Sequence, residues 1–424
     1  MNETQEELTR ALVLHPDIRS DGQRRAAGPA YEEAVALAAA LPHLEVVGGT
    51  VVRLPRPHPG MLFGSGKIQE LAEWIKREEI ALVLIDGPVS PIQQRNLEKE
   101  WKCKVLDRTG LILEIFSDRA ATREGVLQVE MAALSYQRTR LVRAWTHLER
   151  QRGGLGFVGG PGETQIEADR RAIDDQLVRL RRQLDKVVKT RNLHRAARAK
   201  VPFPIVALVG YTNAGKSTLF NRLTGADVMA KDMLFATLDP TMRSVKLPDG
   251  PEIILPDTVG FISDLPTELV AAFRATLEEV LAAQVILHVR DISHAESALQ
   301  AADVRDILES LGTSKEVPMI EVWNKIDRVD EERRETLINQ AARSDNTMVL
   351  SAVTGEGLDE LLATVSEALE GARVEETLEL GFSDGKKRAW LFKKGFVLEE
   401  RQTETGFEID VRWTQKDSNQ YKDV

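Results

Sequence analysis

Residues 210–217 read GYTNAGKS and match the P-loop pattern G-x-x-x-x-G-K-[ST] along its whole length. The apolar run at residues 204–209 predicts a buried strand before the loop, and residues 218–224 predict a helix after it, ending at Gly225. A strand that leads through such a loop into a helix restricts this part of the chain to an α/β layered fold. It also predicts a nucleoside triphosphate site, because the backbone N–H groups of the loop can surround phosphate oxygens.

Two side chains of the loop have predicted chemical roles. Lys216 is expected to reach the terminal phosphates and to act in catalysis, and the Ser217 hydroxyl is expected to ligate Mg²⁺. The predicted nucleotide contacts in this segment are Gly210, Tyr211, Thr212, Asn213, Ala214, Gly215, Lys216, Ser217 and Thr218.

Residues 324–327 read NKID and follow another apolar run, which predicts a base-binding loop at the end of a strand. The Asp327 carboxylate would accept hydrogen bonds from the ring N–H and the 2-amino group of guanine. Adenine lacks that amino group, so a site built on these bonds discriminates strongly against ATP. We therefore expect GTP as substrate and GDP as product. The predicted base contacts are Asn324, Lys325, Asp327, Ser351 and Ala352, the last pair through a backbone N–H that meets the guanine oxygen.

Residues 257–260 read DTVG and fit the D-x-x-G pattern of the switch II segment. Asp257 would hold Mg²⁺ through water, and the Gly260 N–H would sense the γ-phosphate. Between the P-loop and this motif, Thr237 is the expected switch I ligand of Mg²⁺, with Thr241 as the alternative. Contacts are predicted for Phe235, Thr237, Asp257, Thr258, Val259 and Gly260. The predicted metal ligands are Ser217 and Thr237, and the predicted catalytic residues are Lys216, Thr237 and Gly260.

Phe261 follows the D-x-x-G motif. A glutamine that orients the attacking water often stands at this position, and a phenyl ring cannot do so, which predicts slow intrinsic hydrolysis. Asn213 offers a partial remedy, because cation-dependent GTPases carry an asparagine there that helps to coordinate K⁺ beside the phosphates. The alternative for Asn213 is a loop residue that caps its own turn.

The length of 424 residues and the hydrophobic content of 42% indicate a globular protein of several domains. Residues 1–116 alternate predicted strands and helices, as in an α/β domain, and residues 64–67 (GSGK) begin one of these helices as either a structural turn or an anion site. The one cysteine, Cys103, is expected to be an inert core thiol. The scattered histidines predict no zinc site, and the lack of a signal peptide or a bilayer-spanning run predicts a cytoplasmic protein.

Charge is segregated along the chain. Residues 1–116 carry a net charge of −3, residues 117–200 of +8 and residues 201–424 of −15. The basic part has apolar residues at spacings of three, four and seven in two long segments, which predicts an antiparallel pair of helices that form an arm. A basic stripe in an otherwise acidic protein favours a nucleic acid partner, and a solvated helix face is the alternative.

A glycine-rich loop at residues 153–165 connects the two predicted helices at the tip of the arm. Thr164 and Glu167 are expected to form a capping box for the second helix. Capping does not explain the glycines, Leu155 or Phe157, which favour contact with an RNA surface over a passive spacer.

Residues 201–371 form the predicted GTPase domain, and residues 372–424 a small α+β domain with a helix at 384–394 and a hairpin after it. Its basic residues either contact RNA or protein or form a solvated face. They are Lys386, Lys387, Arg388, Lys393 and Lys394, together with Trp390. The predicted fold class is α/β: a P-loop GTPase domain, preceded by an α/β N-terminal domain with a long antiparallel helical arm, and followed by this small C-terminal domain.

With these motifs placed, the chain resembles the HflX family of ribosome-associated GTPases. The residues that carry the resemblance are 160–165 (GPGETQ), 210–218 (GYTNAGKST) and 257–262 (DTVGFI). The resemblance implies a monomeric factor that binds the large ribosomal subunit near its peptidyl-transferase region. It also implies that the factor splits stalled or idle 70S ribosomes with GTP and leaves after ribosome-stimulated hydrolysis.

The family's pattern further implies that residues 117–200 contact rRNA, with the tip at 153–165, and that an apolar residue at position 261 is normal. Arg290 and Pro256 are less typical of the family. Two alternatives of other classes are a GTP-regulated RNA-remodelling or ribosome-assembly factor, and a nucleotide-regulated scaffold without important turnover.

Overall fold

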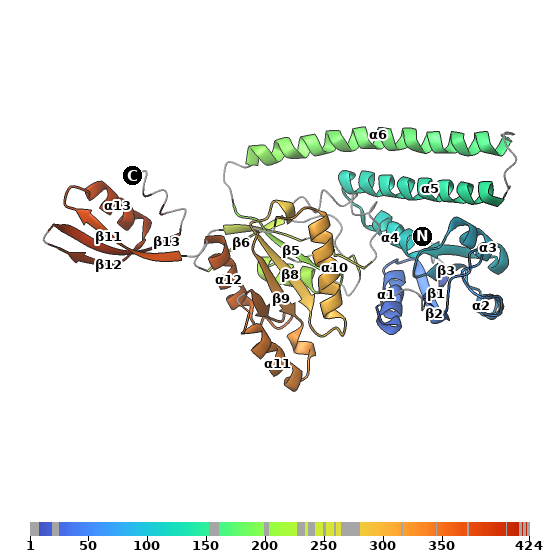
Figure 1. The fold of residues 1–424 in the computed structure, drawn as a ribbon, viewed down its shortest axis with the longest axis horizontal. Coiled ribbons are helices and arrows are strands. Elements are labelled where there is room, and N and C mark those ends of the chain that lie inside the picture. Colours follow the sequence, from blue (N-terminus) through green and yellow to red (C-terminus); the bar gives the residue numbers. More distant parts are fainter. Residues whose placement is uncertain are drawn as a thin grey trace, which may run out of the picture.

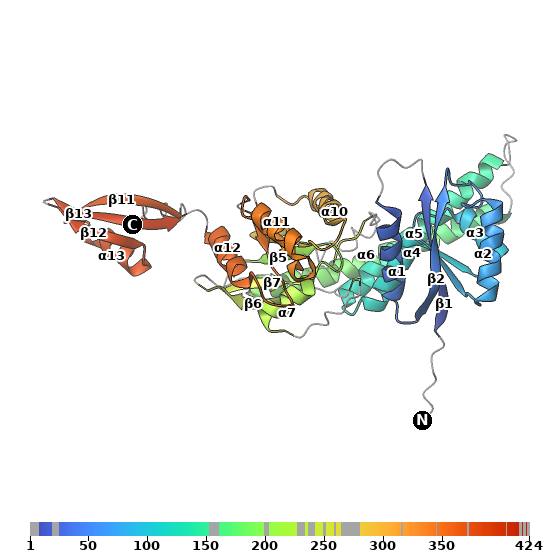
Figure 2. The same cartoon turned by 90° about the horizontal axis from the view of Figure 1, so that it is seen from below.

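The computed structural model describes most of the chain. It leaves out residues 1–7, 19–24, 152–160, 199–202, 227–233, 236–241, 249–251, 258–259, 264–279, 315–316, 345, 371–372, 404, 415–417, 419–420 and 422–424. Of residues 142–151, 161–166, 191–198, 370, 373, 374 and 414 it describes the backbone alone. The described parts form three bodies in a row, with a pair of long helices along one side (Figures 1 and 2).

The N-terminal body is a parallel four-stranded sheet in the order β2-β1-β3-β4, covered by helices. Alternate residues of a strand point to opposite faces, so Leu12 and Leu14 pack with α2 and α3, while Ala11 and Val13 pack with α1 and α4. Along the chain the elements are β1 (Thr9–Ile18), α1 (Ala27–Ala39), β2 (Leu44–Leu54), α2 (Ser65–Arg77), β3 (Leu82–Ile85), α3 (Pro91–Trp101), β4 (Lys104–Asp107) and α4 (Arg108–Arg119).

Helix α4 was not predicted from the sequence. After the predicted strand at residues 104–107, the next helical segment was expected only from Ser117 onward. The helix begins after Asp107, whose side chain accepts a hydrogen bond from the Gly110 N–H at 2.9 Å. Its apolar residues 111–116 are buried almost all round, with Glu114 as the exposed exception. An amphipathic period is therefore missing from this segment.

The arm consists of α5 (Arg123–Gln151) and α6 (Pro161–Arg198), which lie side by side. The predicted antiparallel pair is confirmed, and the apolar residues Leu127 of α5 and Leu180 of α6 are buried in the seam where the two helices meet. The 38 residues of α6 give a helix about 57 Å long. Arg138 of α5 and Asp174 of α6 form an ion pair between the helices at 2.8 Å.

Helix α6 starts earlier than predicted. Pro161 is its first residue, a position that suits proline because the missing N–H has no partner there. Thr164 and Glu167 therefore lie inside the helix, and the predicted capping box is wrong. Of the predicted tip loop, residues 153–160 lie outside the described residues and residues 161–165 belong to α6.

The central body is built on the parallel sheet β10-β9-β8-β5, which the antiparallel pair β6-β7 joins through a bridge between Ile205 and Ile254. Helices cover the sheet, as expected for an α/β domain (Figure 1). The elements are β5 (Val206–Gly210), α7 (Lys216–Thr224), β6 (Met242–Lys246), β7 (Glu252–Pro256), β8 (Val285–Asp291), α10 (Ser297–Ser310), β9 (Met319–Asn324), the 3₁₀ helix η1 (Ile326–Arg328), α11 (Glu331–Ala341), β10 (Thr347–Val349) and α12 (Leu358–Glu370).

The C-terminal body is an antiparallel sheet in the order β11-β13-β12 with one helix on it. Leu391 of the helix and Trp413 of the sheet belong to its apolar core. Its elements are β11 (Arg373–Gly381), α13 (Gly385–Lys394), β12 (Val397–Gln402) and β13 (Gly406–Thr414), so the predicted helix and hairpin are confirmed. Among the described residues, no helix combines the length and the apolar character that a membrane span requires.

Candidate nucleotide-binding site

The P-loop lies between β5 and α7, and its two flanking glycines are required by close neighbours. A Cβ on Gly210 would stand 2.2 Å from the carbonyl oxygen of Val289 on the adjacent strand. Gly215 has φ +92°, and a Cβ there would stand 2.3 Å from the Asn324 side chain. The loop is therefore packed tightly between two other segments of the domain.

Lys216 is buried at the start of α7, and its Nζ donates to the Tyr211 carbonyl oxygen at 2.8 Å. Burial lowers the pKa of Lys216 to about 8, while the nearby Asp257 carboxylate raises it and Lys325 lowers it. An anion beside this ammonium group would favour its charged form.

Ser217 and Asp257 come together beside the loop, as the magnesium prediction requires. The Ser217 hydroxyl donates to the fully buried Asp257 carboxylate at 3.1 Å. These oxygen donors fit a hard cation such as Mg²⁺. Thr237, its alternative Thr241, and the predicted contacts Thr258 and Val259 lie outside the described residues. In the described part of the chain, no group of three or more His, Cys, Asp or Glu residues is placed to hold a metal ion.

The N-K-x-D segment joins three loops at the predicted base site. The Asn324 amide donates to the Ala214 carbonyl oxygen at 2.9 Å and accepts from the Ala352 N–H at 3.0 Å. Lys325 donates to the Asn213 carbonyl oxygen at 2.7 Å and pairs with Asp291 at 2.8 Å. Asn324 and Lys325 therefore connect the base-binding loops to the P-loop.

Two of the predicted base contacts have different surroundings. Asp327 lies in the short helix η1 with its side chain exposed, so its carboxylate is accessible to a ligand. Ser351 is buried, and its hydroxyl accepts from the Thr354 N–H at 3.1 Å. The Ala352 N–H already donates to Asn324, so its predicted bond to a guanine oxygen stays a prediction.

Asn213 has an exposed side chain and a left-handed backbone with φ +58°. Asparagine tolerates this conformation better than most residues, which gives it a conformational reason to stand here. An exposed amide oxygen in the loop also suits the predicted K⁺ contact.

Phe261 is buried and cannot orient a water molecule. Its ring belongs to the apolar cluster that also contains Val209. Its backbone bridges to the P-loop on both sides: the Phe261 N–H donates to Gly210 at 3.1 Å, and its carbonyl accepts from the Thr212 N–H at 2.7 Å. The segment after D-x-x-G is thus attached to the P-loop through main-chain bonds.

Two predicted nucleotide contacts have side chains that face the N-terminal domain instead. The Tyr211 hydroxyl donates to Glu33 of α1 at 2.5 Å. The Phe235 ring packs edge-on against Phe116 of α4 with ring centroids 4.7 Å apart. Only their backbones are available to line the nucleotide site, and these domain contacts were missed by sequence reasoning.

Arg290, which is less typical of the family, has a structural explanation. Its guanidinium pairs with Glu321 on the adjacent strand β9 at 2.6 Å and lies 5.6 Å from the centre of the Trp323 ring. Pro256 ends strand β7, opposite Met242. Neither residue disturbs the motifs.

A parallel sheet whose strands end at a P-loop and at an N-K-x-D loop, with a D-x-x-G segment beside them, defines a P-loop GTPase. Four family models match the chain: GTP-binding GTPase N-terminal at residues 29–117, GTP-binding GTPase Middle Region at 119–198, 50S ribosome-binding GTPase at 205–325 and HflX C-terminal domain at 336–423.

The curated relatives agree with these models. A GTPase HflX from Magnetococcus marinus is 49% identical over 95% of this chain and 92% of its own length. A GTPase HflX from Escherichia coli is 44% identical over 88% and 86%. A putative GTP-binding protein 6 from Xenopus laevis is 35% identical over 92% and 74%. The chain belongs to the HflX family of GTPases.

Proposed function

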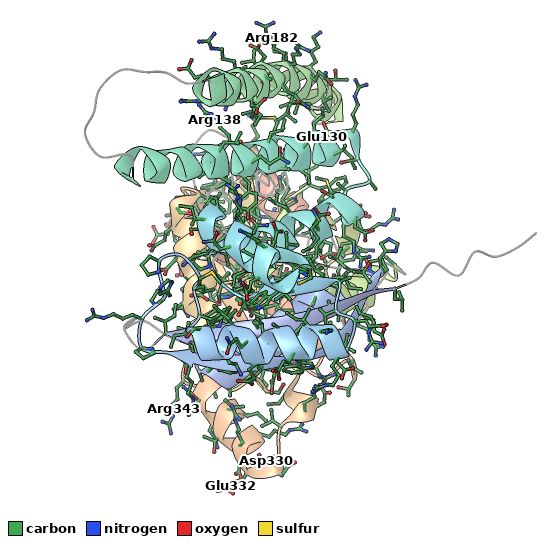
Figure 3. All side chains as sticks on the ribbon, turned by 90° about the vertical axis from the view of Figure 1, so that its right-hand side faces the viewer. Glu130, Arg138, Arg182, Asp330, Glu332 and Arg343 are labelled. Atoms are coloured by element: carbon green, nitrogen blue, oxygen red, sulfur yellow. The ribbon has the colours of Figure 1, made fainter. Side chains whose placement is uncertain are left out.

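We propose that this protein, with GTP bound, attaches to the large ribosomal subunit and splits stalled or idle 70S ribosomes, and that ribosome-stimulated hydrolysis releases it. The observation that carries the proposal is the match of residues 205–325 to a 50S ribosome-binding GTPase. The arm supports it, because α6 presents exposed basic side chains that suit a phosphate backbone: Arg179, Arg181, Arg182, Lys186 and Lys189. In Figure 3, Arg182 projects from α6 at the end of the molecule opposite Asp330.

The proposed roles in the site follow from its geometry and from the predicted motifs. The P-loop backbone and Lys216 hold the phosphates, and Asp327 binds the guanine base. Ser217 and Thr237 would hold Mg²⁺, with Asp257 acting through water, and the bound ion would neutralise charge on the phosphates. The Gly260 N–H is proposed to contact the γ-phosphate.

Sedimentation of 70S ribosomes tests the proposed function. With this protein and a non-hydrolysable GTP analogue, we expect 70S particles to convert to free subunits, and with GDP we expect them to stay intact. Intact 70S particles under both conditions, together with no stimulation of GTP hydrolysis by ribosomes, would refute the proposal.

Charge reversal on the arm tests the rRNA contact. The triple variant Arg179→Glu, Arg182→Glu and Lys186→Glu is expected to bind GDP normally and to lose ribosome splitting, because it replaces phosphate partners with repelling charges. The matched control reverses Lys76, Arg77 and Lys99, three exposed basic residues outside the arm. Equal splitting activity in both variants would show that these side chains of α6 do not contact rRNA.

We also propose that K⁺, held by Asn213, supplies positive charge beside the phosphates during hydrolysis. The GTPase rate should then be higher in KCl than in NaCl. Asn213→Gly keeps the positive φ but removes the amide oxygen, so it should abolish the difference between the two salts. Equal rates of the unaltered protein in KCl and NaCl would rule the cation out.

A further inference from the structure

A buried polar cluster joins the N-terminal domain to the residues that follow the D-x-x-G motif. We call it the interdomain cluster. The side chains of Glu33 and Arg108 are each 8% exposed and pair at 2.6 Å, and Arg108 also pairs with Asp86 at 2.6 Å. The members of the cluster are Arg25, Glu33, Asp86 and Arg108 from the N-terminal domain, and Tyr211 and Ser263 from the GTPase domain.

Ser263 makes three hydrogen bonds to other members of this cluster. The Ser263 N–H donates to the Tyr211 hydroxyl at 2.8 Å, and the two hydroxyl groups lie 2.7 Å apart. Arg108 donates to the Ser263 carbonyl oxygen at 3.0 Å. Both main-chain groups of Ser263 are therefore satisfied by residues that the N-terminal domain supplies or holds.

Tyr211 is the link between the two domains. Its hydroxyl donates to Glu33 and accepts from the Ser263 N–H, while its carbonyl oxygen accepts from Lys216. Burial and the adjacent Glu33 carboxylate raise the pKa of Tyr211, so the hydroxyl keeps its proton at neutral pH. One P-loop residue thus contacts the N-terminal domain, the segment after D-x-x-G and the phosphate-site lysine.

These bonds restrain the segment that directly follows Gly260. With Phe261 attached to Gly210 and Thr212, and Ser263 attached to the cluster, residues 261–263 are held at both ends. A Cβ on Gly260 would stand 2.9 Å from the Thr212 Cα and 3.2 Å from the Lys216 Nζ. Gly260 therefore lies directly beside the group that is expected to reach the terminal phosphates.

The same N-terminal helix also contacts the other predicted switch segment. Arg108 is the first residue of α4, and Phe116, two turns further along the helix, packs against Phe235. Phe235 stands two positions before Thr237. One helix outside the GTPase domain thus contacts the neighbourhood of both predicted switches.

We propose that Tyr211, Glu33 and Arg108 are positioning residues that hold Gly260 where its N–H meets the γ-phosphate. This inference rests on the proposed contact between Gly260 and the γ-phosphate. GDP has no γ-phosphate, so the positioning strengthens the binding of GTP over GDP. Because such coupling is reciprocal, GTP in turn strengthens the docking of the N-terminal domain.

The test is the ratio of GTP-analogue to GDP affinity in Tyr211→Phe. This variant removes one hydroxyl but leaves Glu33 paired with Arg25 and Arg108. We expect the Kd of a non-hydrolysable GTP analogue to rise about tenfold, within the usual range of such coupling, and the Kd of GDP to stay within about twofold. The matched control is Tyr136→Phe on α5 of the arm. It removes a hydroxyl that is bonded at 2.6 Å to Asp107, the last residue of β4, and it should change neither Kd.

The outcomes separate this inference from the proposed role of Gly260. A rise in both Kd values, a change in neither, or tighter binding of the GTP analogue by Tyr211→Phe would overturn the inference. Gly260→Ala tests the underlying contact: if it leaves the affinity ratio unchanged, the proposed γ-phosphate contact fails and the inference fails with it. If Gly260→Ala changes the ratio and Tyr211→Phe does not, the positioning role alone is wrong.

A second variant covers the case in which Tyr211→Phe does not fold. Ser263→Ala removes the hydroxyl that faces Tyr211 and donates to Asp303, but it keeps the main-chain bonds to Tyr211 and Arg108. Its GTP-analogue Kd should rise by about threefold, less than in Tyr211→Phe, with the Kd of GDP unchanged. An equal change for both nucleotides would count against positioning.

Discussion

A histidine in the middle of strand β8 shows how a single residue links this fold to pH. His288 is completely buried, and neither of its ring nitrogens has a hydrogen-bond partner among the described residues. Burial lowers the pKa of His288 to about 4, although the Glu321 carboxylate raises it. The side chain is therefore neutral in the folded protein at physiological pH.

We predict that His288 makes the GTPase domain less stable in mild acid. Its folded pKa lies below its unfolded value near 6.5, so the unfolded chain takes up the extra proton first and stability is lost as the pH falls from about 6.5 toward 4. Between pH 7.5 and 5.5 this loss amounts to about 1.4 kcal/mol, or roughly 2 °C in Tm if the N-terminal and GTPase domains unfold as one unit.

His288→Leu should reduce the fall in Tm between those two pH values by that amount. Scanning calorimetry of the variant and the unaltered protein in matched buffers measures it. The same fall in both proteins would show that the imidazole finds a partner or solvent when protonated.

Asp327 is predicted to carry the guanine specificity. Asp327→Asn should weaken both GTP and GDP binding by at least about 100-fold, because the amide cannot accept both hydrogen bonds that the base donates. Asp330→Asn removes the same charge three residues away at the start of α11, where either side chain caps the helix, and should leave both affinities unchanged. Calorimetric titration measures both, and a similar loss in the two variants would point to a general charge effect.

At the level of elements, the arm is predicted to fold as a unit separate from nucleotide binding. Leu180 faces the seam with α5 and is 7% exposed, whereas Val178, two residues earlier, is 49% exposed. Leu180→Asp should melt part of α6, because a carboxylate at the seam loses its solvation, and Val178→Asp should not. Circular dichroism measures the helix content, and GDP affinity should stay unchanged in both variants. A loss of GDP affinity in Leu180→Asp alone would mean that the arm supports the nucleotide site.

The elements also show what local patterns can predict. The β1 to β4 strands, the helical pair, the GTPase motifs and the C-terminal helix and hairpin all carry local signals, namely a period or a loop motif. Helix α4 carries no amphipathic signal because it is buried on most sides, and it crosses the predicted boundary between residues 116 and 117. That boundary and those at 200/201 and 371/372 stay predictions.

In the nucleotide-binding site, too, the parts that carry a local motif were predictable and the contacts between distant segments were not. The motifs lie side by side, with Ser217 bonded to Asp257 and Asn324 bonded to the P-loop, and their roles toward a nucleotide stay predictions. The interdomain cluster was out of reach, because Glu33 and Tyr211 are 178 residues apart and Glu33 reads as an ordinary solvent-facing residue of an amphipathic helix. Only the folded chain shows that this face of α1 is covered.

Across the whole molecule, the N-terminal and GTPase domains share one apolar core. The cluster contains Leu37 and Phe116 from the N-terminal domain together with Val209 and Ile286 from the GTPase domain. The C-terminal domain has its own core around Trp413. We therefore expect the first two domains to unfold together and the third to unfold independently.

This shared core predicts that GDP stabilises a domain it does not touch. At a GDP concentration of 100 times Kd, the stabilisation is about 2.7 kcal/mol. Hydrogen exchange should slow in β1 of the N-terminal domain by a factor of up to about 100, and β13 should show no change. Exchange in β1 that ignores GDP would mean that the two domains open separately.

The side chain of Tyr211 also bears on how such chains are recombined. A GTPase domain with its P-loop is commonly treated as an independent unit that keeps its function when it is transferred to another chain. Here the second residue of the loop completes the hydrogen bonds of Glu33 in another domain, and Phe235 completes an apolar contact with Phe116. A chimera that exchanges the GTPase domain between relatives must therefore transfer positions 33, 108 and 116 as well. Otherwise two intact domains will meet at an interface whose side chains do not fit each other.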